Sequence, residues 1–390
     1  MRLCVPRPAS ILTNRSIHKP AVHRSSRLTT MASASNSSSA PSPDYKPRYI
    51  DIGINLADPI FRGRYHGKSR HPDDLAGVIQ RAADVGCTKL IVTGSSFKSS
   101  RDALKLAAQF PHPRLRPGPI PTHPPSPPST IDPSRTTTIL TDLRALITTA
   151  GPSLVALGEF GLDYDRLHYC PAPTQLHSFS SQLSLAASLT PQLPLFLHSR
   201  AAHRDFVRLL QDAFGERLER LTAGGVVHSF TGSVEELREL MELGLYIGIN
   251  GCSFKTKENC DVVREVRLDR LMLETDGPWC EVRASHEGWR YLVEAHKKVE
   301  PVVEEEGKGK KKQGGGGGGG KKNQKEPEVP ERFKVVKKEK WEEGAMVKGR
   351  NEPCTIERIA TIVAGIKGVS VEEVCEAAWA NTVKVFGVGS

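Results

Sequence analysis

The chain of 390 residues lacks features that would place it in several common functional classes. It has no apolar run of the ~18 residues that a membrane-spanning helix needs, so we expect a soluble protein without a membrane partner. Its eight cysteines never occur as CxxC. This absence argues against a zinc ribbon or a thioredoxin-type site and favours free thiols in a reducing compartment.

The chain also lacks an evenly spread positive charge, although its formal net charge is +10. Residues 1–48 hold eight Lys or Arg against one acid, and residues 302–348 hold thirteen against nine. The remainder is close to neutral. Overall charge therefore does not identify a nucleic-acid-binding protein, and any affinity for phosphate must come from local groups.

Two biased segments set the predicted domain boundaries. Residues 1–47 are predicted to form a disordered tail. Within them, residues 1–30 contain six Lys or Arg and no acid, which is typical of a mitochondrial transit peptide, although a start at Met31 explains them equally. Residues 302–348, with seven consecutive glycines between lysine clusters, predict a disordered insertion or a basic strap for nucleic acid. The predicted folded domain therefore consists of residues 48–300 together with residues 349–388. We expect the protein in the cytoplasm or nucleus, or in mitochondria if residues 1–30 are translated.

Short apolar runs alternate with helical patterns through this domain. Strands are predicted at 48–55, 89–93, 194–197, 225–227, 245–249 and 271–275, and another leads into Glu159. A further strand, within 114–128, must be short or irregular because this stretch contains seven prolines. Eight strands with intervening helices predict an α/β fold, a (β/α)8 TIM-type barrel, with an open doubly wound sheet as the alternative.

Four of the predicted strands lead into side chains that bind metal ions: Glu159, His198, His228 and Asp276. A single histidine here would most often be a buried core residue. The strands of a barrel, however, end at one face, so these four side chains can converge on one ion. Carboxylate oxygen and imidazole nitrogen suit divalent cations such as Zn, Mn, Co or Mg, and carboxylate-rich sites favour Mg and Mn.

Eight sequence words occur in a fixed order along the chain. They are DIGINLADPIFRG at 51–63, TGSS at 93–96, GEFGLDYDR at 158–166, FLHSR at 196–200, VVHSFTG at 226–232, YIGINGCS at 246–253, ETDGPW at 274–279 and RNEP at 350–353. Through these words the sequence resembles the TatD-like deoxyribonuclease family of the amidohydrolase superfamily, in its eukaryotic branch. The resemblance covers about residues 49–300 and 349–388.

The resemblance implies the metal ligands Glu159, His198, His228 and Asp276, the set already reached from the strand ends. It also implies hydrolysis of DNA phosphodiesters from a 3′ end, with one or two divalent ions per chain, Mg first and Mn or Zn as alternatives. The partner is then DNA, as single strands or duplex ends, or RNA. Many relatives carry an HxH pair on the first strand. Here Gly53 and Asn55 stand in its place, so Asp51 and Asn55 offer at most a weak first-strand site.

Roles for individual residues follow as hypotheses. Asp276 is the candidate base that accepts a proton from water, and Glu159 holds the metal beside it. Arg200 is the candidate phosphate contact, with a structural salt bridge as the alternative. His123, in what remains of the family's Gly-x-His-Pro turn, is a second substrate-facing candidate. Asp163 and Asp165 are predicted to cap a helix or to orient ligands.

Two other functions stay open. The same barrel and ligands could hydrolyse an amide or ester, for example as an aminoacyl-tRNA deacylase, because metal-activated water attacks carbonyl carbon as well as phosphorus. A non-enzymatic scaffold stabilised by metal is the other. Substrate profiling separates the two hydrolases, and the scaffold predicts no turnover with any metal.

Overall fold

The computed structural model describes residues 45–94, 96–110, 115–117, 132–299 and 329–388. The predictions for residues 1–44, for most of the proline-rich segment and for the glycine run lie outside the described residues. His123 is among the residues that are not described.

Eight parallel strands of the described part form the centre of the fold, each hydrogen-bonded to its neighbours in chain order within two runs. The first run is β1 (Tyr49–Ile54), β4 (Cys87–Val92) and β5 (Leu115–Pro117). The second is β6 (Leu157–Asp163), β7 (Leu195–Arg200), β8 (Gly225–Val227), β9 (Tyr246–Ile249) and β10 (Leu271–Leu273). Backbone hydrogen bonds from Asp276 N to Gly53 O (2.8 Å) and from Asn55 N to Gly277 O (2.9 Å) join the end of β10 to β1. The strand order has no reversal, which a doubly wound sheet requires, so the predicted TIM-type barrel is confirmed.

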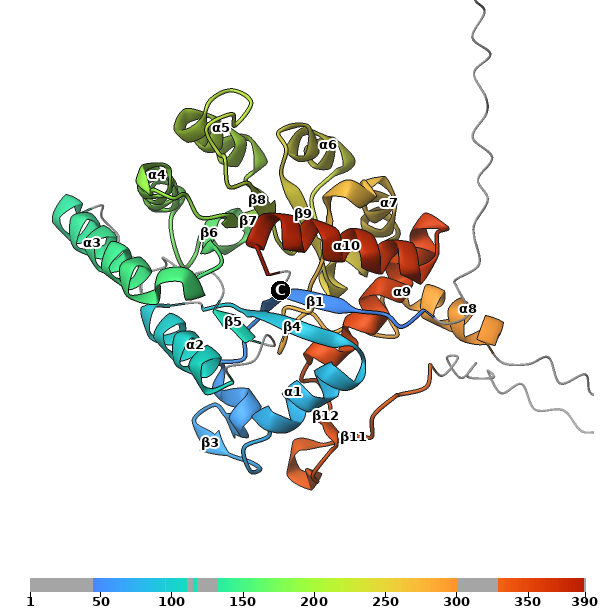
Figure 1. Cartoon of the computed structure of the whole chain (residues 1–390). Helices are drawn as coiled ribbons and strands as arrows, with labels where there is room; N and C mark the ends of the chain where they lie inside the picture. Colours follow the sequence, from blue (N-terminus) through green and yellow to red (C-terminus); the bar gives the residue numbers. More distant parts are fainter. Residues whose placement is uncertain (1–44, 95, 111–114, 118–131, 300–328, 389–390) are drawn as a thin grey trace, which may run out of the picture. The chain divides into compact units, whose positions relative to one another are not determined.

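Helices surround these strands (Figure 1). Their bounds are α1 (Leu75–Asp84), α2 (Phe97–Gln109), α3 (Pro133–Ala150), α4 (Ala172–Ser188), α5 (His203–Phe214), α6 (Val234–Glu242), α7 (Lys257–Glu265), α8 (Trp289–Val299), α9 (Ile356–Lys367) and α10 (Val371–Phe386). The 3-10 helices are η1 (Pro59–Arg62), η2 (Gly151–Ser153), η3 (Tyr164–Arg166), η4 (Gly251–Phe254), η5 (Leu268–Arg270), η6 (Lys338–Lys340) and η7 (Pro353–Thr355). No helix in the described ranges is long and apolar enough to cross a membrane.

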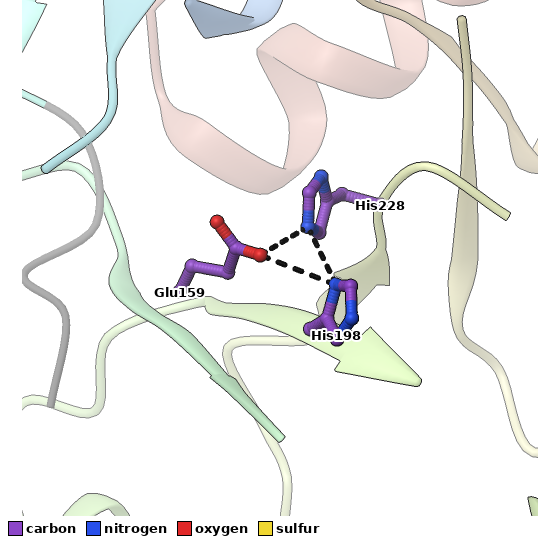
Figure 2. Close-up of side chains that lie close together, drawn as sticks. All are labelled: Glu159, His198 and His228. Carbon is purple, nitrogen blue, oxygen red and sulfur yellow. Dashed lines mark hydrogen bonds and ion pairs between the residues drawn. The ribbon is translucent and has the colours of Figure 1, made fainter. Parts of the chain in front are cut away.

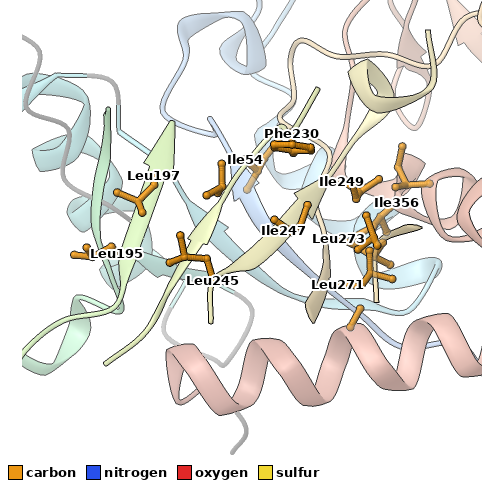
Figure 3. Close-up of a cluster of buried hydrophobic side chains, with 14 of the residues drawn as sticks. Ile54, Leu195, Leu197, Phe230, Leu245, Ile247, Ile249, Leu271, Leu273 and Ile356 are labelled. Atoms are coloured by element: carbon orange, nitrogen blue, oxygen red, sulfur yellow. The ribbon is translucent and has the colours of Figure 1, made fainter. Parts of the chain in front are cut away.

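The alternation of side chains along each strand divides the apolar core in two. Leu195, Leu197, Ile247, Leu271 and Leu273 point outward and pack with the surrounding helices (Figure 3). The residues between them point into the barrel, where Phe196, Tyr246 and Met272 form a separate cluster with Ile50, Ile52 and Val226. Phe386 and Val388, from the end of α10 and beyond it, join this inner cluster. α10 therefore closes the barrel at the amino ends of the strands, opposite the ligand-bearing ends.

Helix boundaries follow from caps and apolar stripes. In α5, Phe206, Leu210 and Phe214 recur every four residues and are all buried. α6 begins at a capping box in which Ser233 and Glu236 satisfy each other's backbone N–H. α7 begins at Lys257 because the Thr256 side chain accepts from Asn259 N and caps the helix there.

The predicted disordered insertion over 302–348 is wrong for residues 329–348, which are folded. They contain β11 (Val335–Val336) and β12 (Met346–Val347), a parallel pair. Met346 and Val347 are buried, and the Trp341 ring stacks on His71 with 5.5 Å between centroids. These few apolar side chains suffice to hold the segment, although the surrounding lysines and glutamates dominate its composition. The segment also touches the hairpin of β2 (Arg64–Tyr65) and β3 (Lys68–Ser69), where Lys338 Nζ lies 5.0 Å from the centre of the Tyr65 ring.

A buried ion cluster ties the RNEP word to α1. Arg350 contacts Asp74 and lies 2.7 Å from Glu352, while Arg81 lies 2.8 Å from Glu352 and 3.0 Å from Asp74. All four side chains are at most 3% exposed. Because each charge has two opposite partners, the cluster tolerates burial and fixes the C-terminal segment against the first helix.

Candidate metal centre

Glu159 of β6, His198 of β7 and His228, the residue after β8, meet side by side (Figure 2). Glu159 Oε1 lies 2.7 Å from His228 Nε2 and 3.2 Å from His198 Nδ1. The two imidazole nitrogens are 3.3 Å apart. One carboxylate oxygen and two imidazole nitrogens therefore converge on one point, which is the donor set that a divalent cation accepts.

Close pairing of β6 and β7 places two of these side chains. Glu159 and His198 lie inside their strands, not after them as the apolar runs had predicted. A Cβ atom at Gly158 would lie 2.0 Å from Phe196 O, and one at Gly161 would lie 1.8 Å from His198 O. Only glycine at these two positions allows the backbones to approach so closely, and this approach brings Glu159 to His198.

Opposite charges set the protonation of the group. Burial acts to raise the pKa of Glu159, but His228 and His198 outweigh it and hold the pKa of this carboxyl well below its usual range. Burial acts to lower the pKa of His228, yet the carboxylates of Glu159 and Glu274 raise it well above its usual range. The carboxylate is thus ionised while His228 carries a proton, and a bound cation would take the place of that proton.

Glu274, in the ETD word, is a functional residue that the sequence analysis missed. It is fully buried, and its Oε1 accepts from Ser229 N at 2.5 Å and from Asn250 Nδ2 at 3.3 Å. Its Oε2 lies 3.5 Å from His228 Nδ1. A carboxylate behind a ligating histidine fixes the ring and its tautomer. Glu274 therefore holds His228 with Nε2 toward Glu159.

The space for Glu274 comes from glycines on other strands. A Cβ atom at Gly53 would lie 2.7 Å from Glu274 Oε2, and one at Gly248 would lie 3.0 Å from Glu274 Oε1. By the resemblance described above, Gly53 takes the position of the first histidine of an HxH pair. The glycine in that position thus accommodates the carboxylate that supports His228, and this pairing across three strands is the signal that could have identified Glu274.

Asp276 lies beside the group of three and is not part of it. Its Oδ1 accepts from Asn55 Nδ2 at 3.1 Å, and its Oδ2 accepts from the Cys280 thiol at 3.1 Å. Burial raises the pKa of Asp276 to about 7, and the positive charge on His228 opposes that rise. A carboxyl with a pKa near neutrality can both accept and return a proton.

The two candidates for a first-strand site are tied to the segment after β10. Asn55 Nδ2 donates to Asp276, and Asn55 Oδ1 accepts from the Thr93 hydroxyl at 2.7 Å. Asp51 is fully buried and accepts from Thr275 N at 3.0 Å and from the Thr275 hydroxyl at 2.5 Å. Burial raises the pKa of Asp51 to about 8. In these contacts Asn55 orients Asp276 and Asp51 fastens β1 to Thr275, while metal binding by either stays a prediction.

Arg200 and Asp163 end the neighbouring strands β7 and β6. Asp163 Oδ2 lies 3.5 Å from His198 Nε2, and Asp163 also caps η3 by accepting from Asp165 N at 3.1 Å. Arg200 has no carboxylate within 4.0 Å among the described residues, and its buried Nε has no hydrogen-bond partner there. The described ranges thus show no structural salt bridge at Arg200, the alternative to a phosphate contact.

A parallel barrel that brings together Glu159, His198 and His228, with the buried carboxyl of Asp276 beside them, defines a metal-dependent hydrolase of the TIM-barrel class. The family model described as TatD related DNase matches residues 50–387, and the chain belongs to that family.

Named relatives and a solved structure agree with this membership. The chain is 41% identical over 342 residues to the deoxyribonuclease Tat-D of Schizosaccharomyces pombe, covering 87% of this chain and 96% of that protein. It is 35% identical over 233 residues to the 3'-5' ssDNA/RNA exonuclease TatD of Erwinia tasmaniensis, covering 59% and 80%. A crystal structure of an uncharacterized amidohydrolase from Saccharomyces cerevisiae is similar with a TM-score of 0.71 and 32% identity, covering 87% of this chain and all of that one. The resemblance seen in the sequence words is confirmed.

Proposed function

We propose that this chain is a metal-dependent deoxyribonuclease that hydrolyses DNA phosphodiester bonds. The observation that carries the proposal is the convergence of Glu159, His198 and His228 in a TatD-related barrel. The name of the bacterial relative supports removal of nucleotides from a 3′ end, with single-stranded DNA and RNA as substrates. Mg is the favoured cation, because Asp276 and Glu159 add hard oxygen atoms to the site, and Mn or Zn are the alternatives.

The residues divide the chemistry between them. Glu159, His198 and His228 would hold the cation. When bound, a divalent cation polarises a phosphoryl oxygen and makes water more acidic. Asp276 accepts the proton of the attacking water and returns it to the leaving oxygen, and its burial, which raises the pKa of this carboxyl, favours uptake of the proton. Asn55 and Cys280 keep its two oxygens in place.

Arg200 is the proposed phosphate contact. Its guanidinium is free of carboxylate partners within 4.0 Å in the described part of the chain, and two N–H groups can face two phosphate oxygens. We expect Arg200→Ala chiefly to raise KM for DNA, and Arg200→Lys to recover part of the loss by restoring the charge. An unchanged KM in Arg200→Ala would remove this residue from the substrate site.

The test is digestion of end-labelled single- and double-stranded DNA and RNA by the full chain, first in EDTA and then with Mg, Mn or Zn restored. We expect metal-restored digestion from the 3′ end, and Asp276→Asn should abolish it while the protein stays folded. Asp212→Asn, which removes an exposed carboxylate from α5, is the matched control. Wild-type turnover in Asp276→Asn would refute the assignment of the base. No digestion with any metal, together with hydrolysis of a carbonyl ester, would replace the nuclease by the ester hydrolase.

A further inference from the structure

Two loops beside Asp276 form one continuous surface. We call residues 250–256, after β9, and residues 277–288, after β10, the β9–β10 rim. The Sγ atoms of Cys252 and Cys280 are 3.1 Å apart, and Glu287 N donates to Lys255 O at 3.3 Å. A Cβ atom at Gly251 would lie 1.9 Å from Cys280 O, so the two backbones are in direct contact. The rim is therefore held as a unit next to the proposed base.

Trp279 exposes its ring on this rim. It is 52% exposed, whereas the other three tryptophans of the chain are partly buried. Its backbone is fixed, because Trp279 N donates to Asp276 O at 3.1 Å and Asn351 N donates to Pro278 O at 3.0 Å. The indole has no ring contact with any other described residue. A large apolar ring is thus held in water three residues from Asp276, although its burial would be favourable.

Two exposed cations of the rim accompany this ring. Neither Lys255 nor Arg283 has a carboxylate within 4.0 Å in the described part of the chain. Their charge acts on the rim: burial lowers the pKa of His286, and Lys255 and Arg283 lower it further. The rim also carries two carboxylates: Glu287 lies 3.2 Å from Arg290, outside the rim, and burial raises the pKa of Glu281 while Arg283 lowers it. The rim thus has no net formal charge, but Lys255 and Arg283 are exposed cations without a carboxylate within 4.0 Å in the described part of the chain.

A single exposed aromatic residue is ordinary on a protein surface, and so is a solvated charge. Here both kinds of group lie on one rigid rim beside the proposed base. A nucleotide is a ligand that needs both, since its base offers a flat ring and its phosphate a negative charge. In a duplex, both faces of a base are covered by its stacked neighbours, so the exposed ring fits a single strand.

We propose that the β9–β10 rim binds a nucleotide of a single strand next to the bond that is cut, with the base stacked on Trp279 and a phosphate held by Lys255 and Arg283. This inference rests on the proposed nuclease function and names how the site takes its substrate. Stacking accepts every base, so the rim confers a preference for single-stranded ends without sequence specificity.

The experiment measures binding in EDTA, where no digestion occurs. Anisotropy of a 5′-labelled oligo-dT reports the Kd of the full-length wild type and of Trp279→Ala, Trp279→Phe and Val335→Ala. Loss of a stacking aromatic costs about 1–3 kcal/mol per base, so we expect Trp279→Ala to raise Kd about 5- to 150-fold. Trp279→Phe should retain most of the affinity. Val335→Ala trims an exposed apolar residue outside the rim and should have no effect.

A second oligonucleotide series isolates the stacking contact. Each oligonucleotide carries one abasic site, stepped back from the 3′ end, with all phosphates kept. We expect one position to weaken wild-type binding, and in Trp279→Ala the intact and abasic strands should then bind equally. Lys255→Gln and Arg283→Gln should each reduce the slope of log K against log salt by about 1.

The outcomes separate this inference from the proposed function. If the wild type digests DNA but no abasic position weakens its binding, and Trp279→Ala binds as the wild type does, the inference is overturned while the nuclease stands. If the wild type neither binds nor digests nucleic acid, the proposed function fails first. Should Trp279→Ala not fold, the abasic series on the wild type still decides, because it needs no substitution.

Discussion

Replacing Glu274 with glutamine changes how His228 is held while keeping the shape of the side chain. Glu274 accepts from Ser229 N and Asn250 Nδ2 at one oxygen and faces His228 Nδ1 with the other. A glutamine amide has a single acceptor atom. If its oxygen stays with Ser229, its NH2 group faces His228 Nδ1, and the ring must then carry its proton on Nε2. Nε2 is the atom that faces Glu159, so the ring could no longer give a lone pair to a cation.

The reverse orientation of the amide has a different consequence. Its oxygen would face His228 and its NH2 group would face Ser229 N, which leaves buried donors unpaired at about 1–3 kcal/mol. In the first orientation, loss of an outer partner of a ligating histidine costs about 10- to 100-fold in metal affinity, or about 1.4–2.7 kcal/mol. We therefore expect Glu274→Gln to lose either metal affinity or stability, and metal affinity if the Ser229 contact persists.

Two measurements on the same protein distinguish these results. Calorimetric titration with Mn gives the metal Kd, and chemical denaturation in EDTA gives the free energy of unfolding. Glu242→Gln, at an exposed position at the end of α6, is the matched control and should change neither. If Glu274→Gln binds Mn like the wild type and is equally stable, Glu274 has no part in holding His228.

Three further predictions concern charge inside the fold. Metal affinity should rise with pH. The carboxylates beside His228 outweigh the effect of burial and raise the pKa of His228, so metal binding must release the proton that this ring carries. Calorimetric titrations in buffers of different ionisation enthalpy should count about one released proton, and the absence of proton release would contradict the prediction. Glu352→Gln leaves Arg81 and Arg350 with too little negative charge, so the free energy of unfolding should fall by about 3–5 kcal/mol in denaturant, and a loss below ~1 kcal/mol would show that the cluster is not needed. Burial raises the pKa of Asp51 to about 8, so between about pH 4 and 8 the folded chain keeps a proton on Asp51 that the unfolded chain releases. The free energy of unfolding should therefore fall as the pH rises through this range. Asp51→Asn should lack that part of the pH dependence of stability.

The barrel and three closely spaced side chains could be predicted because each depends on local pattern. An apolar run that leads into His198 or His228 reports both the strand and the face at which it ends. The proline-rich stretch correctly indicated a short third strand, and β5 has three residues. The runs did not show that β6 extends beyond Glu159, because this extension depends on the fit of Gly158 and Gly161 against β7.

What could not be predicted depends on contacts between distant strands. Glu274 looked like a spacer before Asp276, and its role becomes evident only when Gly53 and Gly248 are seen to make room for it. The fold of residues 329–348 could not be predicted from their composition either, because the Trp341 ring stacks on His71, which is far away in the sequence. The composition of a segment does not reveal which distant residues it will contact.

The closure of the barrel by α10 also determines when the protein can fold. Glu376 on α10 bonds to Arg48 at the start of β1, 328 residues earlier, and the Val388 carbonyl bonds to Lys89 on β4, 299 residues earlier. During synthesis, the inner faces of the first strands therefore lack their packing partners until α10 has left the ribosome. Contacts of such sequence separation make folding slow and expose apolar surface meanwhile. The first strands are thus the part of the fold whose apolar faces stay uncovered longest, although they are the first to be made.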